Sequence, residues 1–96
     1  MLTIQEIKQA VTKIGKKYGI KNAYLFGSYA KGKATEHSDV DLLVNLGEIT
    51  DYYSYEDMRL NLAKELGTNV DMISSDSIKP RFYDLIKNDR ILLYGA

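Results

Sequence analysis

Two aspartates, Asp39 and Asp41, stand one residue apart at the point where the chain turns apolar, in the stretch SDVDLLV. Because side chains alternate along a strand, both would project to one face, about 7 Å apart. Two such carboxylates in a partly buried site repel each other and lose hydration unless a cation neutralises them. The spacing therefore indicates a site for a cation.

A third acid, Asp71, lies inside another apolar stretch, NVDMI. If this strand lies beside the first one through a right-handed crossover, Asp71 reaches the same face. Any one of these acids could instead cap a turn or pair with a lysine. Strands disfavour aspartate, however, so the set favours a metal site. Three carboxylates suit a hard divalent cation, Mg²⁺ or Mn²⁺.

A Gly27-Ser28 pair follows the apolar run AYLF. Glycine lets the backbone approach a ligand, while the Ser28 hydroxyl and the amides at a helix start can hold phosphate oxygens. Alone, the pair would indicate an ordinary turn, and only the acids downstream raise it above that. Lys31 and Lys33 flank the same loop. Either lysine could meet a triphosphate. We assign Lys31 with Gly27 and Ser28 to phosphate binding, and the favoured interpretation of Lys33 is a solvated lysine.

The elements that must position these residues follow from apolar periodicity and from turn residues. Thr3 and Glu6 fit a capping box, and Gly19 and Gly67 supply two helix ends. We expect helices over 3–18, 53–66 and 77–86, one helical turn plus a loop over 28–38, and strands over 23–26, 39–46, 69–73 and 91–94. This order predicts an α/β (α+β) fold, in which helices cover a small mixed sheet of about four strands.

The length of 96 residues predicts one domain, 1–96. No apolar run is long enough for a membrane span, and the chain has no cysteine, so we expect a cytoplasmic protein without disulfides. Seven lysines face two acids up to residue 38, whereas six basic residues face eleven acids after it. The basic part is either a solvated surface or an electropositive rim for a polyphosphate. The net charge of zero argues against direct nucleic-acid binding.

Three further features favour structural interpretations. We interpret His37 as a solvated loop residue, because no second histidine or cysteine stands at ligand spacing. Tyr52, Tyr53 and Tyr55 at a helix start could form a docking patch, but half-buried packing is the favoured interpretation. Arg59 is expected on the surface, with contact to a nucleotide as the less favoured alternative.

The string GSYAKGKATEHSDVDLLV resembles the signature of the nucleotidyltransferase fold shared by DNA polymerase beta and the kanamycin nucleotidyltransferases: Gly27-Ser28, ten residues, then Asp39-Val40-Asp41. It is similar in particular to the minimal nucleotidyltransferase (MNT) family, commonly the antitoxin of a HEPN/MNT pair. The resemblance implies that Gly27 and Ser28 hold the triphosphate of ATP. It further implies that Asp39 and Asp41 bind two metal ions and that Asp71 helps activate the attacking hydroxyl.

On this resemblance, the expected activity is transfer of AMP from ATP to a tyrosine hydroxyl of a HEPN ribonuclease toxin, which silences the toxin. The sequence ends just after the last expected strand, so we expect the partner in a hetero-oligomer to supply the acceptor surface. Two alternatives remain open. The protein could neutralise the toxin by binding alone, or it could modify a small molecule.

Overall fold

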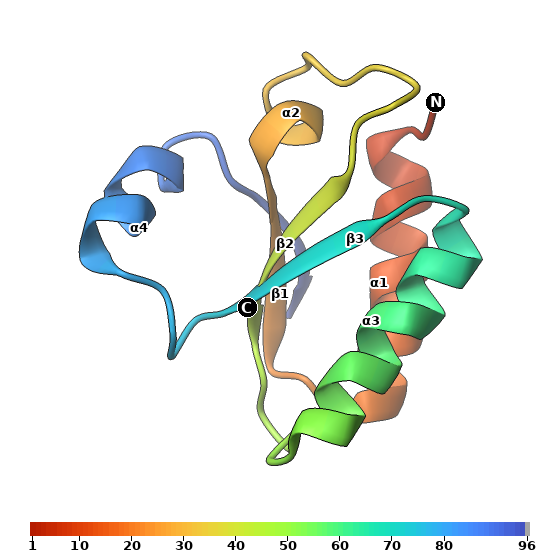
Figure 1. Ribbon diagram of the computed structural model, residues 1–96, viewed down its shortest axis with the longest axis vertical. Helices are drawn as coiled ribbons and strands as arrows, with labels where there is room; N and C mark the ends of the chain where they lie inside the picture. Colours follow the sequence, from red (N-terminus) through yellow and green to blue (C-terminus); the bar gives the residue numbers. More distant parts are fainter. Residues whose placement is uncertain (96) are drawn as a thin grey trace.

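The computed structural model describes residues 1–95, which form a four-stranded sheet with helices on both faces (Figure 1). No helix in this part of the chain is both long and apolar enough to cross a membrane. The elements in chain order are α1 (Ile4–Tyr18), β1 (Asn22–Phe26), α2 (Gly27–Ala30), β2 (Val40–Asn45), α3 (Tyr52–Leu66), β3 (Val70–Ser74), α4 (Pro80–Ile86) and β4 (Ile91–Gly95).

The sheet has the strand order β3-β2-β1-β4 and is mixed. β1 pairs antiparallel with both β2 and β4, whereas β2 and β3 are parallel. Parallel neighbours need a crossover, and α3 supplies it between β2 and β3. β3 is the first strand of this order and so lies at one edge of the sheet, and it follows α3 in the chain.

Local sequence signals begin and end the two long helices. Thr3 accepts a hydrogen bond from the Glu6 amide, and Glu6 returns one to the Thr3 amide, which completes a capping box. Asp51 caps the start of α3 through the Ser54 amide. Gly19 and Gly67 end these helices with φ angles of 74° and 68°, a left-handed conformation that glycine adopts without strain.

The two faces of the sheet are covered unequally. The main core lies between the sheet and the helices α1 and α3, which Figure 1 shows on one side of the strands. Val40, Leu42 and Val44 of β2 point into this core and are at most 1% exposed. On the other face a smaller cluster joins Phe26 and Leu43 to Ile86 of α4. The alternation of β2 thus separates a stabilising face from a second face that carries Asp41.

The observed architecture confirms the predicted sheet of four strands covered by helices. Most element boundaries agree with the expected ranges within one residue. The largest difference is that α4 begins at Pro80 rather than at residue 77, because residues 75–77 form a turn in which the Ser77 amide donates to the Ser74 carbonyl. β2 begins at Val40, so Asp39 lies just before the strand rather than within it. The helical turn expected within 28–38 begins one residue earlier, at Gly27, directly after β1.

The two-faced packing predicts different costs for two leucine truncations. Leu42 is fully buried, so Leu42→Ala should lower the free energy of unfolding by about 2–5 kcal/mol, as core cavities do. Leu92 on the edge strand β4 is 42% exposed, and Leu92→Ala should cost less than about 1 kcal/mol. Chemical denaturation of both variants checks this, and equal costs would contradict the assignment of the main core.

Candidate active site

Asp41 and Asp71 lie side by side on neighbouring strands. They are register partners in the parallel pairing of β2 with β3, so their side chains leave the same face of the sheet. Phe26 at the end of β1 is the register partner of Asp41 on its other side. The prediction that Asp71 reaches the face of Asp41 through a crossover is confirmed.

Burial and like charge act together on Asp41. Desolvation is the largest cause that raises the pKa of Asp41, and the negative charges of Asp71 and Asp39 and a hydrogen bond with Asp71 add to it. Together they raise the pKa to about 6. Asp71 itself is exposed, and Oδ1 accepts a hydrogen bond of 3.4 Å from Asn69 Nδ2. The site therefore concentrates negative charge that a bound cation would neutralise.

The three aspartates of the site carry the type of ligand atom that a hard cation binds. Asp39, Asp41 and Asp71 offer carboxylate oxygens, which Mg²⁺ and Mn²⁺ prefer. Within residues 1–95, however, no group of three or more acidic or histidine side chains is gathered closely enough to form a ready metal cage. Asp41 and Asp71 are the adjacent pair on the sheet, and Asp39 is the last residue of the loop before β2. The metal assignment of the three aspartates stays a prediction.

Gly27 brings the backbone directly against Asp41. Its φ angle is 74°, and a Cβ at this position would overlap the carboxylate of Asp41. Glycine is thus required here both by backbone conformation and by space. Ser28 follows as the second residue of α2, and in the described chain no side chain caps the start of this helix. The predicted phosphate-binding residues therefore stand beside the acidic pair.

Lys31 lies one turn further on, as the residue that ends α2. It is exposed, and it is not among the residues that line the cleft over Asp41 and Asp71. Lys33 and His37 are exposed in the same loop, as expected for solvated residues. The assignment of Lys31 to phosphate binding stays a prediction.

A cleft of about 530 Å³ opens over the two carboxylates and crosses the edge strand β3. Its floor contains Asp41 and Asp71. The walls combine aromatic and charged side chains from three directions: Phe26 from β1, Phe82 from α4, and Tyr52, Tyr55, Glu56 and Arg59 from α3. The size is that of a small-molecule site. The acidic pair is thus accessible to a ligand rather than enclosed in the core.

Arg59 is at the surface, as expected, but its side chain is held in place. It is 24% exposed and lies in the wall of the cleft, where the less favoured alternative of contact with a nucleotide stays a prediction. Nε donates to Glu56 Oε2 at 2.9 Å, Nη2 donates to Oε1 of the same carboxylate, and Nη1 donates to the Val70 carbonyl at 3.3 Å. These hydrogen bonds hold the pKa of Glu56 below its usual value. Helical periodicity alone could not show which face of α3 meets β3.

The tyrosines at the start of α3 also differ from the favoured interpretation. Tyr52 and Tyr53 are 72% and 86% exposed, whereas Tyr55 is half-buried. Tyr55 donates a hydrogen bond of 2.7 Å from its hydroxyl to the Met72 carbonyl. Packing therefore explains Tyr55 and leaves Tyr52 and Tyr53 without a core role.

A mixed sheet that presents paired aspartates beside a glycine-serine turn defines the class of nucleotidyl-transferring enzymes. Comparison with known families agrees: residues 8–96 match the family "Polymerase beta, Nucleotidyltransferase". The chain belongs to this family and is a nucleotidyltransferase. The resemblance inferred from Gly27-Ser28 and Asp39-Val40-Asp41 is thereby confirmed.

Individual proteins and solved structures of this family are similar to the chain over most of its length. The chain is 37% identical to the Methanocaldococcus jannaschii protein MJ0435, covering 94% of this chain and 97% of that protein. It is 35% identical to protein adenylyltransferase MntA of Thermococcus cleftensis, and the alignment covers 82% of this chain and 84% of that protein. A solved structure assigned as a minimal nucleotidyltransferase superposes with a TM-score of 0.79 at 29% identity, covering 94% and 95%.

The fold also matches the Shewanella oneidensis complex of a tri-AMPylated HEPN toxin with its MNT antitoxin. The TM-score is 0.75 at 21% identity, over 98% of this chain and 74% of that one. At this identity the match supports the fold alone.

The environment of Asp41 predicts a pH dependence of stability in metal-free protein. Its pKa is about 6 in the folded state and about 3.9 unfolded, so the unfolded state ionises first. Stability should therefore fall as the pH rises from about 4 to about 6, by about 1 kcal/mol after allowance for solvent screening. Asp41→Asn should remove this slope and melt higher at pH 7. Thermal melts in chelator check both points, and an unchanged slope in the variant would contradict the pKa assignment.

The contact of Gly27 with Asp41 predicts that Gly27→Ala abolishes most nucleotidyl transfer, because the new methyl group displaces the carboxylate. Gly32→Ala is the matched control, since Gly32 has a φ angle of 71° but has no atom within 4 Å of the added Cβ. Both variants carry the left-handed backbone penalty of about 1 kcal/mol. Only Gly27→Ala should lose activity. Equal activity of the two variants would show that the close approach is unimportant.

Proposed function

We propose that this protein transfers AMP from ATP to a tyrosine hydroxyl of a partner ribonuclease of the HEPN class, and so acts as its antitoxin. The observation that carries the proposal is the register pairing of Asp41 with Asp71 in an open cleft beside Gly27. Such a pair is costly for folding and useful for a reaction that moves a highly charged phosphate. The cysteine-free chain fits a reaction in the cytoplasm.

The reaction forms one bond and breaks one. The hydroxyl oxygen of the acceptor attacks the α-phosphorus of ATP, and the bond from this phosphorus to the bridging oxygen of the β-phosphate breaks. Pyrophosphate leaves with the electron pair. Asp71 is the exposed carboxylate of the pair, and we assign it to receive the hydroxyl proton. Gly27 and Ser28 hold the triphosphate through backbone amides and the serine hydroxyl, and Lys31 is the nearest lysine in sequence to assist them.

Asp39, Asp41 and Asp71 would hold two Mg²⁺ or Mn²⁺ ions, and these would supply positive charge to the α-phosphate and to the departing pyrophosphate. Burial and the neighbouring carboxylates disfavour the charged form of Asp41 and raise its pKa, and a bound cation would offset both effects, which supports this assignment. The protein side chains then position ligands rather than form covalent intermediates.

The acceptor class is supported by relatives. MntA of Thermococcus cleftensis is named a protein adenylyltransferase, and the Shewanella oneidensis complex pairs an MNT antitoxin with a tri-AMPylated HEPN toxin. A structural match of TM-score 0.77 and 23% identity is a toxin-antitoxin bound to AMP-PNP, which supports ATP as the donor. A protein acceptor also agrees with an open cleft at the edge of the sheet.

The second candidate is an antitoxin that neutralises its partner by contact alone, with nucleotide as a structural ligand. The exposed Tyr52 and Tyr53 favour a contact surface in either case. The presence of all three aspartates at one end of the sheet favours the enzyme over the contact-only antitoxin, because neutralisation by contact alone would not require them.

The proposal predicts covalent AMP on a co-expressed HEPN partner. With ATP and magnesium, the wild-type protein should add the mass of AMP to the partner, whereas Asp41→Asn and Asp39→Asn should reduce transfer by at least about a hundredfold. Asp57→Asn, which changes an exposed acid on α3 outside the cleft, is the matched control and should be active. Intact-mass spectrometry of the purified partner provides the measurement.

The same samples separate the two candidate functions. A ribonuclease assay on the partner after removal of the antitoxin should show lasting inactivation. An unmodified partner that regains activity would decide for neutralisation by contact. Modification by Asp41→Asn would place the chemistry elsewhere.

A further inference from the structure

The strand order fixes the side from which an acceptor approaches. Across the sheet stand first the Gly27 turn after β1, then Asp41 on β2, then Asp71 on β3, and at the edge the Tyr55 and Arg59 side chains of α3, which reach the β3 carbonyls. In an in-line displacement the incoming oxygen lies opposite the departing pyrophosphate. With the triphosphate at the Gly27 turn, the acceptor hydroxyl must come from the β3 side, past the residues of α3.

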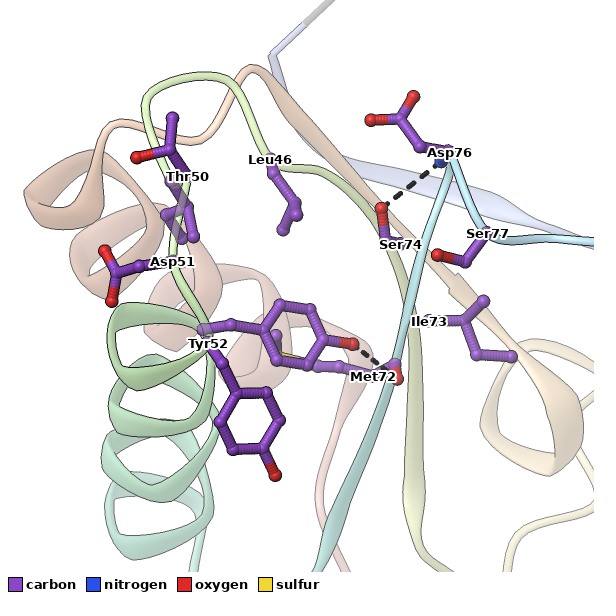
Figure 2. Close-up of a pocket in the computed structure, with 11 residues that line it drawn as sticks. Leu46, Thr50, Asp51, Tyr52, Met72, Ile73, Ser74, Asp76 and Ser77 are labelled. Carbon is purple, nitrogen blue, oxygen red and sulfur yellow. Dashed lines mark hydrogen bonds between the residues drawn. The ribbon is translucent and has the colours of Figure 1, made fainter.

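A second hollow continues the cleft in that direction. Its volume is about 540 Å³, and it shares Tyr52, Tyr55, Met72 and Ile73 with the cleft over the aspartates. Figure 2 shows this hollow between the start of α3 and β3, with Leu46 and Met72 along it and Ser77 at its far side. We call the two connected hollows the edge groove. One acceptor side chain would not fill it, whereas an extended chain segment would.

The outward carbonyls of the edge strand β3 are already occupied. The outward carbonyls of Val70 and Met72 already accept hydrogen bonds from Arg59 and Tyr55, and the Ser74 carbonyl accepts from the Ser77 amide at 3.0 Å. A segment that lies along β3 therefore cannot use these carbonyls as a new strand would. We therefore expect it to bind mainly through side chains that enter the edge groove.

The charges along the groove select its occupant. Asp51 and Asp76 line the outer hollow, and Asp71 and Asp41 line the inner one, whereas the one cation in either lining, Arg59, is paired with Glu56. Because Asp41 and Asp71 are assigned to metal ions, the acids left to act on an acceptor are Asp51 and Asp76 of the outer hollow, which within residues 1–95 has no cation in its lining. These two acids repel a nucleic-acid backbone and attract lysine or arginine. Leu46, Ile49 and Met72 in the lining of the outer hollow suit an apolar side chain.

We propose that the edge groove binds an extended polypeptide segment, in which basic residues and an apolar residue flank the acceptor hydroxyl. The inference rests on the proposed function, because AMP transfer defines which hydroxyl is presented at Asp71. Tyr52 is its main determinant on this chain, since it is 72% exposed and lines both hollows. The groove thus selects the acceptor by side chains beside the reacting tyrosine.

The test is fluorescence-anisotropy binding of a labelled peptide that has a central tyrosine flanked by leucine and lysines, in the presence of magnesium and AMP-PNP. Tyr52→Ala removes one of the side chains that the two hollows share, and it should weaken binding about tenfold, as loss of an aromatic interface anchor does. Ser77→Trp should also weaken binding about tenfold, because the indole ring occupies the outer hollow. Tyr53→Ala is the matched control, because Tyr53 is 86% exposed and lines neither hollow, and it should bind like wild type. A peptide with glutamates in place of the lysines should bind more weakly.

The outcomes distinguish this inference from the proposed function. The proposed binding of a peptide in the edge groove would be contradicted if wild type, Tyr52→Ala and Ser77→Trp bound the peptide equally, or if no binding occurred at millimolar peptide. This holds even if a HEPN partner is AMPylated. Groove-dependent binding without AMP transfer to any acceptor would support the groove and contradict the proposed function. Melting temperatures of the variants within the error of wild type establish that the fold is intact.

Discussion

The parallel pairing of β2 with β3 forces two carboxylates, Asp41 and Asp71, onto neighbouring positions of one sheet face. Everything else in the site depends on this constraint. The crossover α3 fixes the register, and its buried residues Met58 and Leu62 anchor it to the core, so the two charges cannot separate by sliding of the strands. Repulsion between them is relieved only by protonation, which the pKa of Asp41 records, or by a cation.

The fold tolerates this local cost because stability and chemistry occupy opposite faces of the same strands. Val40 and Leu42 on one face of β2 are fully buried against α1 and α3, while Asp41 between them faces the cleft. Removal of a charge from the cleft face therefore leaves the main core unchanged. This separation explains how a chain of 96 residues can hold an acidic site and still fold.

Much of the site could be predicted from sequence because its signals are local. The spacing of Asp39 and Asp41, the Gly27-Ser28 pair and the alternation of β2 are all visible within one short string. The sequence predicts that the strand begins at Asp39, but β2 begins at Val40. The sequence has no glycine or proline at this point to mark the strand end. Arg59 and Tyr52 could not be assigned, because their roles depend on the position of β3 at the sheet edge. That position is set by strand order, which no local pattern encodes.

The central claim is that the aspartates bind nucleotide through a divalent cation. Calorimetric titration of ATP into wild type and Asp41→Asn, each with magnesium and with chelator, tests it most directly. The expected result is that magnesium greatly strengthens ATP binding to wild type and has little effect in Asp41→Asn. Tight binding of ATP to wild type that does not depend on magnesium would contradict the account.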